Sequence, residues 1–367
     1  MGRVRVVAAL RTPVAPRGGA LARFEPHELG APVVRRLLDV AGISADRVDE
    51  IIVGNALGAG GNPARLIALA SGLSEHVGGL SIDRQCCGGL DALVLGAAMI
   101  DAGQAEIVIA GGAESYSRRP VRLRTDPEGG APIAYDRPPF TPWPAQDPEM
   151  DDAANALGAE LGIGRDLQDA WAVDSHKQAL RTDHSAELVS VPGPTRDTFA
   201  RPMTARLAAR APVLSGTITA ANAAVAADGA AFCLMASERV AVGLAAPGLA
   251  YCGGMTLGAR SDRPGIAPVA AIKQLLSLTG VKPEALSVAE VMEAYAVQAI
   301  ACVRESGLPK RIVNLGGGAL ARGHPVGASG AINAVRLFHE VSARGGTGMA
   351  AIAAAGGLGT ALMLSAN

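Results

Sequence analysis

Aromatic residues make up only 3% of this 367-residue chain, and its charges nearly cancel, leaving a net charge of −1. A near-neutral chain argues against nucleic acid or an anionic membrane surface as a partner. No apolar run is long and glycine-free enough to indicate a membrane-spanning helix. The first residues resemble a short strand leading into Thr-Pro rather than a secretory signal, so we expect no signal peptide.

Cysteine is also scarce, with five residues at positions 86, 87, 233, 252 and 302. None of them forms a CxxC motif or a spacing typical of disulfides, and no metal-ligand set is predicted. An odd count of this kind is typical of a reduced, cytoplasmic protein. Cys233, Cys252 and Cys302 fall in apolar segments, which predicts that they are core residues.

Small and apolar residues are abundant: 46 glycines, and 49% hydrophobic against 18% charged residues. This composition favours a large core and tight packing of helices on sheets. Strand-like and helix-like segments alternate along the chain. The predicted strands are 3–10, 48–53, 80–85, 106–110, 249–255, 286–291 and 349–355, and the predicted helices are 28–40, 64–70, 88–102, 168–181, 269–278, 298–306 and 327–344. The alternation predicts an α/β fold with a mostly parallel sheet and helices on both faces.

The two ends of the chain repeat one order of elements: strand, turn, glycine-rich and alanine-rich helix, apolar strand, double glycine. Such self-similarity indicates an internal duplication, with equivalent turns facing each other across a pseudo-twofold axis. The segment between the halves is rich in Pro, Arg and Asp and predicts a long loop region that covers a site. We place the first part of the N-terminal lobe at 1–117, the loop region at 118–216, the return strand at 217–242 and the C-terminal lobe at 243–367.

Two of the five cysteines stand directly before a predicted helix, in RQCCGGLDAL. Cysteine there is either a small packed hydrophobe or a nucleophile, since a helix N-terminus lowers a thiol pKa. The duplication places Cys86 of the first half and His324 of the second half at comparable turns. A Cys–His pair brought together by a fold is suited to thiolate catalysis.

The chain resembles the thiolases, which make or cleave carbon–carbon bonds between acyl-CoA units. The resemblance runs nearly end to end and is carried by RTPV, IDRQCCGGLDAL, GGAESYS, SGTITAANAAVAADGAA, MEAYA, NLGGGALARGHPVGASG and AAAGGLGTA, in that order. The histidine block is highly specific. The resemblance implies thiolase-like duplicated αβαβα lobes with helices on both faces of mixed sheets, plus the central loop region.

The resemblance also implies roles. Cys86 is the nucleophile that takes the acyl group as a thioester, and His324 is its base. The backbone N–H groups of Cys86 and Ala355 form the oxyanion hole. Met150, Glu293 and Gly356 are expected at the substrate pocket, although Glu293 also suits a structural role. The helix N-terminus and the imidazole are expected to favour the Cys86 thiolate.

Two family positions are altered. Ala353 stands where thiolases carry a second cysteine that exchanges a proton with the carbanion. Met292 stands where they carry an asparagine that holds a water against the thioester carbonyl. The residues needed to form the acyl-enzyme are therefore present, whereas Claisen condensation or thiolysis is expected to be impaired or altered. No replacement base is obvious, and Cys87 is expected to be a packed small side chain.

The leading prediction is a thiolase-like acyl-CoA acyltransferase that uses CoA thioesters as substrates and needs no bound cofactor. One alternative is a non-catalytic or accessory subunit of the same fold, and a less favoured one is a decarboxylating, ketosynthase-like condensing enzyme. A homodimer or dimer of dimers is expected. One arginine-rich stretch is expected to be a solvated loop face, and the alternative is that it meets CoA phosphates or a neighbouring subunit: Arg118, Arg119, Arg122 and Arg124.

Overall fold

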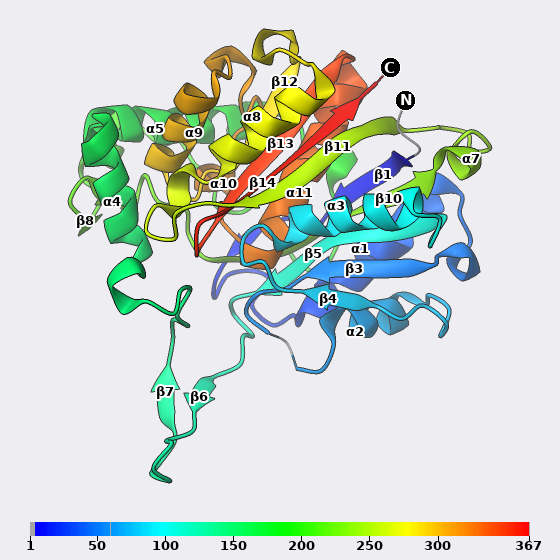
Figure 1. Ribbon diagram of the computed structural model, residues 1–367, viewed down its shortest axis with the longest axis horizontal. Helices are drawn as coiled ribbons and strands as arrows, with labels where there is room; N and C mark the ends of the chain where they lie inside the picture. The colour runs from blue at the N-terminus through cyan, green and yellow to red at the C-terminus, as the bar shows by residue number, and fades with distance from the viewer. Residues whose placement is uncertain (1–3, 59, 367) are drawn as a thin grey trace.

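One ten-stranded sheet runs through the whole protein (Figure 1), in a computed structural model that describes residues 4–58 and 60–366. Its order is β4-β3-β5-β10-β1-β11-β14-β13-β12, with β2 paired to β10. The strands are β1 Val4–Arg11, β2 Ala15–Pro16, β3 Glu50–Gly54, β4 Leu80–Ile82, β5 Ile107–Ser115, β10 Ala227–Ser237, β11 Leu249–Gly258, β12 Val288–Val291, β13 Thr347–Ala354 and β14 Leu358–Ser365. Arg3, the predicted first residue of β1, lies outside the described residues.

The sheet consists of two halves with corresponding strand orders, and the halves are joined at the antiparallel pair β1–β11. Around that centre, β10, β5 and β3 of one half correspond to β14, β13 and β12 of the other. The counterpart of β4 is a single parallel bridge between Ala289 and Val313. The predicted duplication is therefore present.

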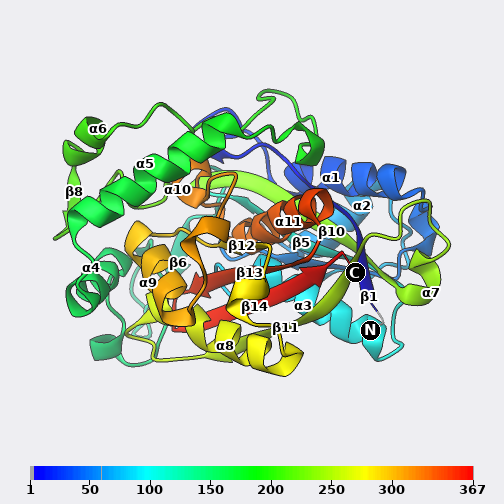
Figure 2. The same cartoon turned by 90° about the horizontal axis from the view of Figure 1, so that it is seen from above.

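Eleven helices flank or connect these strands in the described part of the chain. They are α1 Pro26–Ala41, α2 Pro63–Ser71, α3 Gly88–Asp101, α4 Met150–Leu161, α5 Arg165–Arg181, α6 Ala205–Ala209, α7 Glu238–Ala241, α8 Pro268–Thr279, α9 Ala296–Ser306, α10 Ala319–Arg322 and α11 Val326–Arg344. Helices α1 and α2 cover the outer face of one half of the sheet, and α8 and α9 cover that of the other. Figure 2 shows α1 and α2 on the opposite side of the molecule from α8 and α9. Between the halves, α3 packs against α11. The result is the expected αβαβα arrangement.

Glycines bring the N-terminal ends of α3 and α11 against the sheet. A Cβ atom added at Gly112 would lie 2.0 Å from the Gly327 carbonyl oxygen. A Cβ added at Gly89 would lie 2.7 Å from the same oxygen. Larger side chains would push the two helices away from the strands, and so separate the two turns that precede them.

The prediction of a mostly parallel sheet is wrong. Only β3–β4, β3–β5 and β12–β13 are parallel, and the other paired neighbours in the main sheet run antiparallel. Strand β14, which the pattern did not predict, follows β13 through a turn at 355–357, and strands joined by such a short connection must be antiparallel. The double glycine at 111–112 does not end β5, which continues to Ser115.

The central region is more ordered than predicted. It carries α4, which the pattern did not predict, as well as α5 and α6. It also carries two small hairpins, β6 Arg122–Arg124 with β7 Ile133–Tyr135, and β8 Val213–Ser215 with β9 Ile218–Thr219. The β6–β7 hairpin projects from the body of the protein (Figure 1). The lobe boundaries at 117, 216 and 242 stay a prediction.

Candidate active site

Cys86 lies in a tight turn between β4 and α3. Gln85 adopts a left-handed backbone with φ 51°, which is uncommon for a residue other than glycine. The Asp83 carboxylate stabilises this turn by accepting hydrogen bonds from the Gln85 backbone N–H at 2.8 Å and from its side-chain amide at 3.0 Å. The turn fixes the half-buried Cys86 immediately before the N-terminus of α3.

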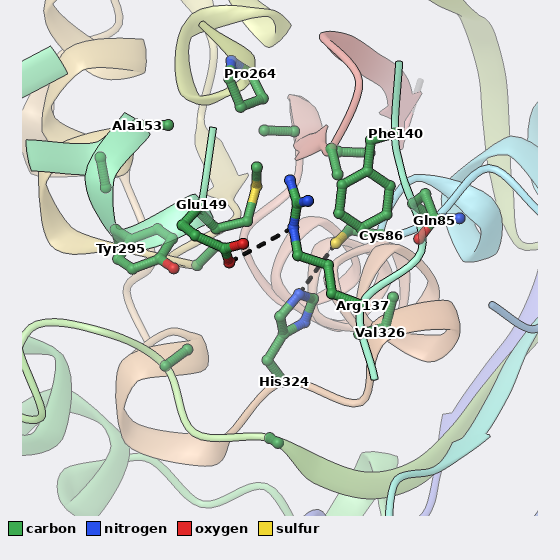
Figure 3. Close-up of a pocket in the computed structure, with 18 of the residues that line it drawn as sticks. Gln85, Cys86, Arg137, Phe140, Glu149, Ala153, Pro264, Tyr295, His324 and Val326 are labelled. Carbon is green, nitrogen blue, oxygen red and sulfur yellow. Dashed lines mark hydrogen bonds and ion pairs between the residues drawn. The ribbon is translucent and has the colours of Figure 1, made fainter. Parts of the chain in front are cut away.

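His324 occupies the equivalent turn before α11. Its backbone N–H donates to the Val225 carbonyl at 2.8 Å. Its Nε2 atom lies 3.2 Å from the Cys86 Sγ atom, so the two turns bring thiol and imidazole into contact (Figure 3). The predicted pairing of Cys86 with His324 is therefore present in the structure.

Ser329 determines which nitrogen of His324 carries the proton. Its hydroxyl donates to the Pro325 carbonyl at 3.0 Å and lies 2.6 Å from His324 Nδ1. Because that hydroxyl proton is already engaged, the serine oxygen accepts from Nδ1–H. Nε2 is then unprotonated and faces the Cys86 thiol as a hydrogen-bond acceptor. Sequence reasoning missed Ser329, although its position five residues after His324 and one turn into the helix was a usable signal.

Burial favours the neutral form of both members of the pair. It raises the pKa of Cys86 to about 12 and lowers the pKa of His324 to about 4. The expectation of a favoured thiolate is therefore wrong, because desolvation outweighs the helix N-terminus. Two groups act in the opposite direction on the thiol pKa, the backbone N–H groups of Cys86 and Ala355. Both predicted oxyanion-hole donors thus face the sulfur.

The pair opens into a cavity of about 460 Å³. One group of lining residues is largely apolar and comes from α4, α9 and neighbouring loops: Phe140, Met150, Ala153, Ala154, Leu157, Pro264, Gly265, Ala294, Tyr295 and Gln298. A second group is polar or charged: Arg17, Gln85, Tyr116, Arg119, Arg122, Asp136, Arg137 and Glu149. The cavity can therefore hold a ligand with both an apolar and an anionic part.

The altered family positions fall in different places. Ala353 lines the cavity together with Ala355. Met292 is 1% exposed, packs in the central core and is absent from the described lining residues. A side chain at 353 can therefore reach a bound substrate directly, whereas Met292 contributes packing in this structure.

Two predicted pocket residues do not line the cavity. Glu293 is buried beneath it and accepts hydrogen bonds from Trp171 at 2.9 Å and Ser175 at 2.7 Å, as well as from Asn314. Gly356, with φ 77°, shapes the turn between β13 and β14, where a Cβ would lie 3.0 Å from the Phe140 carbonyl oxygen. Of the three predicted pocket residues, only Met150 lines the cavity.

The remaining cysteines divide by burial. Cys87, Cys233 and Cys302 are buried, and the Cys87 Sγ atom contacts the Ile352 carbonyl, so it packs as expected. Cys252 is exposed rather than in the core, because it lies at a bulge, where the pairing of β11 with β14 passes from Tyr251 to Gly253.

The predicted arginine stretch is also divided. Arg119 and Arg122 line the cavity. Arg118 instead pairs with Glu25 at 2.9 Å, and Arg124 lies 5.3 Å from the ring centre of Tyr135 on the projecting hairpin.

Within residues 4–58 and 60–366 no helix is suited to cross a membrane, and no cluster of three or more His, Cys, Asp or Glu side chains is arranged to bind a metal.

Comparison with known proteins covers nearly the whole chain. The model described as "Thiolase, N-terminal domain" matches residues 4–239, and "Thiolase, C-terminal domain" matches residues 249–366. The chain is 40% identical to the "Putative acetyl-CoA C-acetyltransferase YhfS" of Bacillus subtilis (strain 168), over 98% of each sequence. It is 33% identical to a VraB protein of the same description from Staphylococcus aureus (strain MRSA252), over 100% of each.

Solved structures give the same result. An acetyl-CoA acetyltransferase of Bacillus anthracis superposes with a TM-score of 0.92 at 31% identity, over 100% of this chain and 99% of that one. A human mitochondrial 3-ketoacyl-CoA thiolase superposes with a TM-score of 0.91 at 29% identity, over 99% and 98%. Two family models that together span almost the full length, and the shared fold, agree with the Cys–His geometry: the chain belongs to the thiolase family.

Proposed function

We propose that this thiolase-family acyltransferase forms an acyl thioester on Cys86, with His324 as the base. The observation that carries the proposal is the 3.2 Å contact between His324 Nε2 and Cys86 Sγ inside the cavity. The names of the relatives, which describe acetyl-CoA acetyltransferases and a 3-ketoacyl-CoA thiolase, support CoA thioesters as the substrate class.

In the first step the Cys86 sulfur attacks the thioester carbonyl of an acyl-CoA, and its proton passes to His324 Nε2. The imidazole is ready to accept this proton because Ser329 holds the Nδ1–H tautomer. The backbone N–H groups of Cys86 and Ala355 stabilise the oxyanion. CoA then leaves with the proton from His324, and the acyl group stays on sulfur.

In the second step the acyl group passes to CoA or to a carbon nucleophile. This step is the altered one, since Ala353 lines the cavity and provides no proton-transfer group. Loss of general acid–base help typically slows a step by about 10²–10⁴-fold. We therefore propose that acylation is efficient and that carbon–carbon bond formation or cleavage is slower than in thiolases with the second cysteine.

Mass spectrometry of the protein after incubation with acetyl-CoA tests the proposal. One acetyl group is expected on the peptide that carries Cys86, and none after Cys86→Ala. Cys252→Ala serves as the matched control and leaves labelling intact. His324→Ala is expected to slow labelling by about 10²–10⁴-fold. Absence of acylation in the unaltered protein would instead favour the accessory-subunit alternative.

Arg119 and Arg122 are the members of the arginine stretch that we propose to contact CoA phosphates, since both line the cavity.

Assembly as a homodimer or dimer of dimers also belongs to the proposal. It is supported by exposed apolar side chains on and beside the projecting hairpin, where Val121 is 84% exposed and Leu123 and Ile133 are each 58% exposed. A cytoplasmic location stays a prediction.

A further inference from the structure

The missing thiol at position 353 raises the question of which group handles the proton in the second step. Cleavage of a 3-ketoacyl-CoA leaves a carbanion on the departing acetyl-CoA, which must take up a proton. The donor has to reach the same cavity as Cys86 and His324. It must also have a proton that is not already committed to another protein atom.

Most polar groups that line the cavity are already engaged. Tyr295 donates to Asp151 at 2.6 Å, the side-chain amide of Gln85 donates to Asp83, and the amide of Gln298 donates to the Cys302 sulfur. Glu149 lies 3.6 Å from Arg137, and Asp136 pairs with Arg119 at 2.5 Å. The arginines, including the exposed Arg17, stay protonated in proteins and are poor proton donors.

Tyr116 is the exception. It follows β5 directly, lines the same cavity as Cys86 and Ala353, and has a half-buried side chain. Its hydroxyl has no hydrogen-bond partner within the described residues. The segment that carries it is fixed, because the Ser117 backbone N–H donates to the buried Asp228 carboxylate at 3.0 Å. The Arg119 guanidinium lies 5.8 Å from the centre of the ring.

The surroundings keep this hydroxyl protonated at neutral pH. Burial is the largest cause of a raised Tyr116 pKa, and any negative charge on Cys86 or Glu114 acts in the same direction. A phenol in this state is suited to donate a proton and unsuited to act as a resting base. Tyr116 and Cys86 line the same cavity, so a ligand held there can contact both side chains.

We infer that the Tyr116 hydroxyl is the proton donor to the departing acetyl-CoA carbanion, in place of the thiol that Ala353 lacks. The inference rests on the proposed acyl-enzyme at Cys86. As the C2–C3 bond of a 3-ketoacyl-CoA breaks, its electron pair takes the Tyr116 proton and forms a C–H bond. The incoming CoA thiol later gives its proton to the Tyr116 phenolate, and its sulfur takes the acyl group from Cys86. Atoms and charges then balance over the cycle.

Tyr116→Phe tests this role, because it keeps the ring and removes only the hydroxyl. Two rates are measured on each protein: acylation of Cys86 by acetyl-CoA, and thiolysis of acetoacetyl-CoA by CoA. Acylation is expected to stay within about twofold, since it needs no carbanion. Thiolysis is expected to fall by about 10²–10⁴-fold, as for loss of a general acid. Tyr135→Phe, the same change on the projecting hairpin, is the matched control and leaves both rates unaltered.

A rescue variant separates a chemical role from a packing role. Adding Ala353→Cys to Tyr116→Phe is expected to restore part of the thiolysis rate, since it returns a proton donor to the same cavity. Thiolysis that survives Tyr116→Phe would overturn the inference, as would an equal loss of acylation and thiolysis. An unaltered protein that acylates but shows no thiolysis would also overturn it and leave the proposed acyl-enzyme standing. A protein that never acylates would fail the proposed function itself.

Discussion

The Nδ1 atom of His324 is held by a single hydroxyl, that of Ser329. While this hydroxyl donates to Pro325, its oxygen accepts from the imidazole, and this arrangement directs the free lone pair of Nε2 at Cys86. Ser329 has no direct contact with the cysteine sulfur, so it is a positioning residue. Its effect on catalysis runs through the tautomer and the ring orientation of His324.

Ser329→Ala is expected to slow Cys86 acylation by about 10–100-fold, the range seen when outer partners of functional histidines are removed in metal sites. The KM for acyl-CoA should change little, because Ser329 is not a lining residue of the cavity. Ser329→Thr should recover much of the rate, since it returns the hydroxyl. Ser306→Ala is a matched control, because Ser306 makes the same bond to a carbonyl four residues earlier, on α9. An unchanged acylation rate in Ser329→Ala would refute the positioning role.

Position 353 offers a gain-of-function test. Ala353→Cys places a thiol in the cavity wall, and we expect faster thiolysis of acetoacetyl-CoA with an unchanged rate of Cys86 acylation. Stopped-flow absorbance of the enolate form of acetoacetyl-CoA measures the first rate, and mass labelling measures the second. Ala353→Ser fills similar space with a far weaker acid and is the control. Equal rates for the alanine and cysteine proteins would show that this proton is not limiting.

Adding Met292→Asn to that variant is expected to be harmful. The thiolase pattern has an asparagine at this position, but Met292 is packed in the central core. A buried amide without partners costs about 1–3 kcal/mol. The free energy of unfolding should therefore fall by about that amount, without a further gain in thiolysis.

At the scale of elements, the crossing of α3 and α11 sets the distance between thiol and imidazole. Each helix begins directly after one of the two reactive turns, so any separation of the helices separates Cys86 from His324. The contact has no room for a side chain on one helix: a Cβ added at Gly330 would lie 2.5 Å from the Leu90 backbone nitrogen and 2.8 Å from its Cβ atom. The glycines of the histidine block therefore serve helix contact as well as turn geometry.

Gly330→Ala is expected to lower the free energy of unfolding by about 1–3 kcal/mol, the usual range for overpacking a tight contact. It should also slow acylation of Cys86, because α11 must shift away from α3. Urea unfolding and mass labelling measure the two effects. Gly164→Ala is the control, because a Cβ there meets no atom within 4 Å. A Gly330→Ala protein with unaltered acylation would show that the helix crossing does not control the site.

At the scale of the whole molecule, several charges are buried away from the active site. Glu290 on β12 is 1% exposed, and its Oε1 atom has no hydrogen-bond partner. Burial raises the pKa of this carboxyl to about 7, although the charges of Arg336 and Arg322 act to lower it. A second buried carboxyl, Glu114, also has its pKa raised to about 7 by burial. Both groups are more easily ionised in the unfolded chain.

Because their pKa values are raised, the two carboxyls keep their protons up to a higher pH in the folded protein than in the unfolded chain. The stabilising contribution of each carboxyl is therefore complete below about pH 4.5 and is lost as the pH rises through about 7. For Glu290 the loss is on the order of 3 kcal/mol. Glu290→Gln should remove about half of the decline in unfolding free energy between pH 5 and pH 8, as measured by urea titration. Glu284→Gln, at an exposed site, should leave the decline unchanged, and an unaltered slope in Glu290→Gln would contradict the assignment.

Much of this molecule follows from local sequence. Helix and strand positions were predictable because apolar spacing and glycine or proline boundaries act within a few residues. The roles of Cys86 and His324 were predictable as a proposal, because two similar glycine-flanked turns recur in the duplicated halves. Ala353 and Met292 were visible as departures from the thiolase pattern for the same reason: a motif shows which residue type is missing.

Tertiary structure decided the rest. Strand direction, and the antiparallel β14, depend on how distant segments meet. The pKa of Cys86 rises because burial by the whole fold outweighs its local helix N-terminus. Glu293 belongs to a buried hydrogen-bond network with Trp171 and Ser175, which no spacing near residue 293 reveals. The Tyr116 hydroxyl stands out because most other polar groups around the cavity are engaged with other side chains. Residue types and the spacing of apolar residues can be taken from the sequence alone. Desolvation and hydrogen-bond partners depend instead on residues that are far apart in the chain.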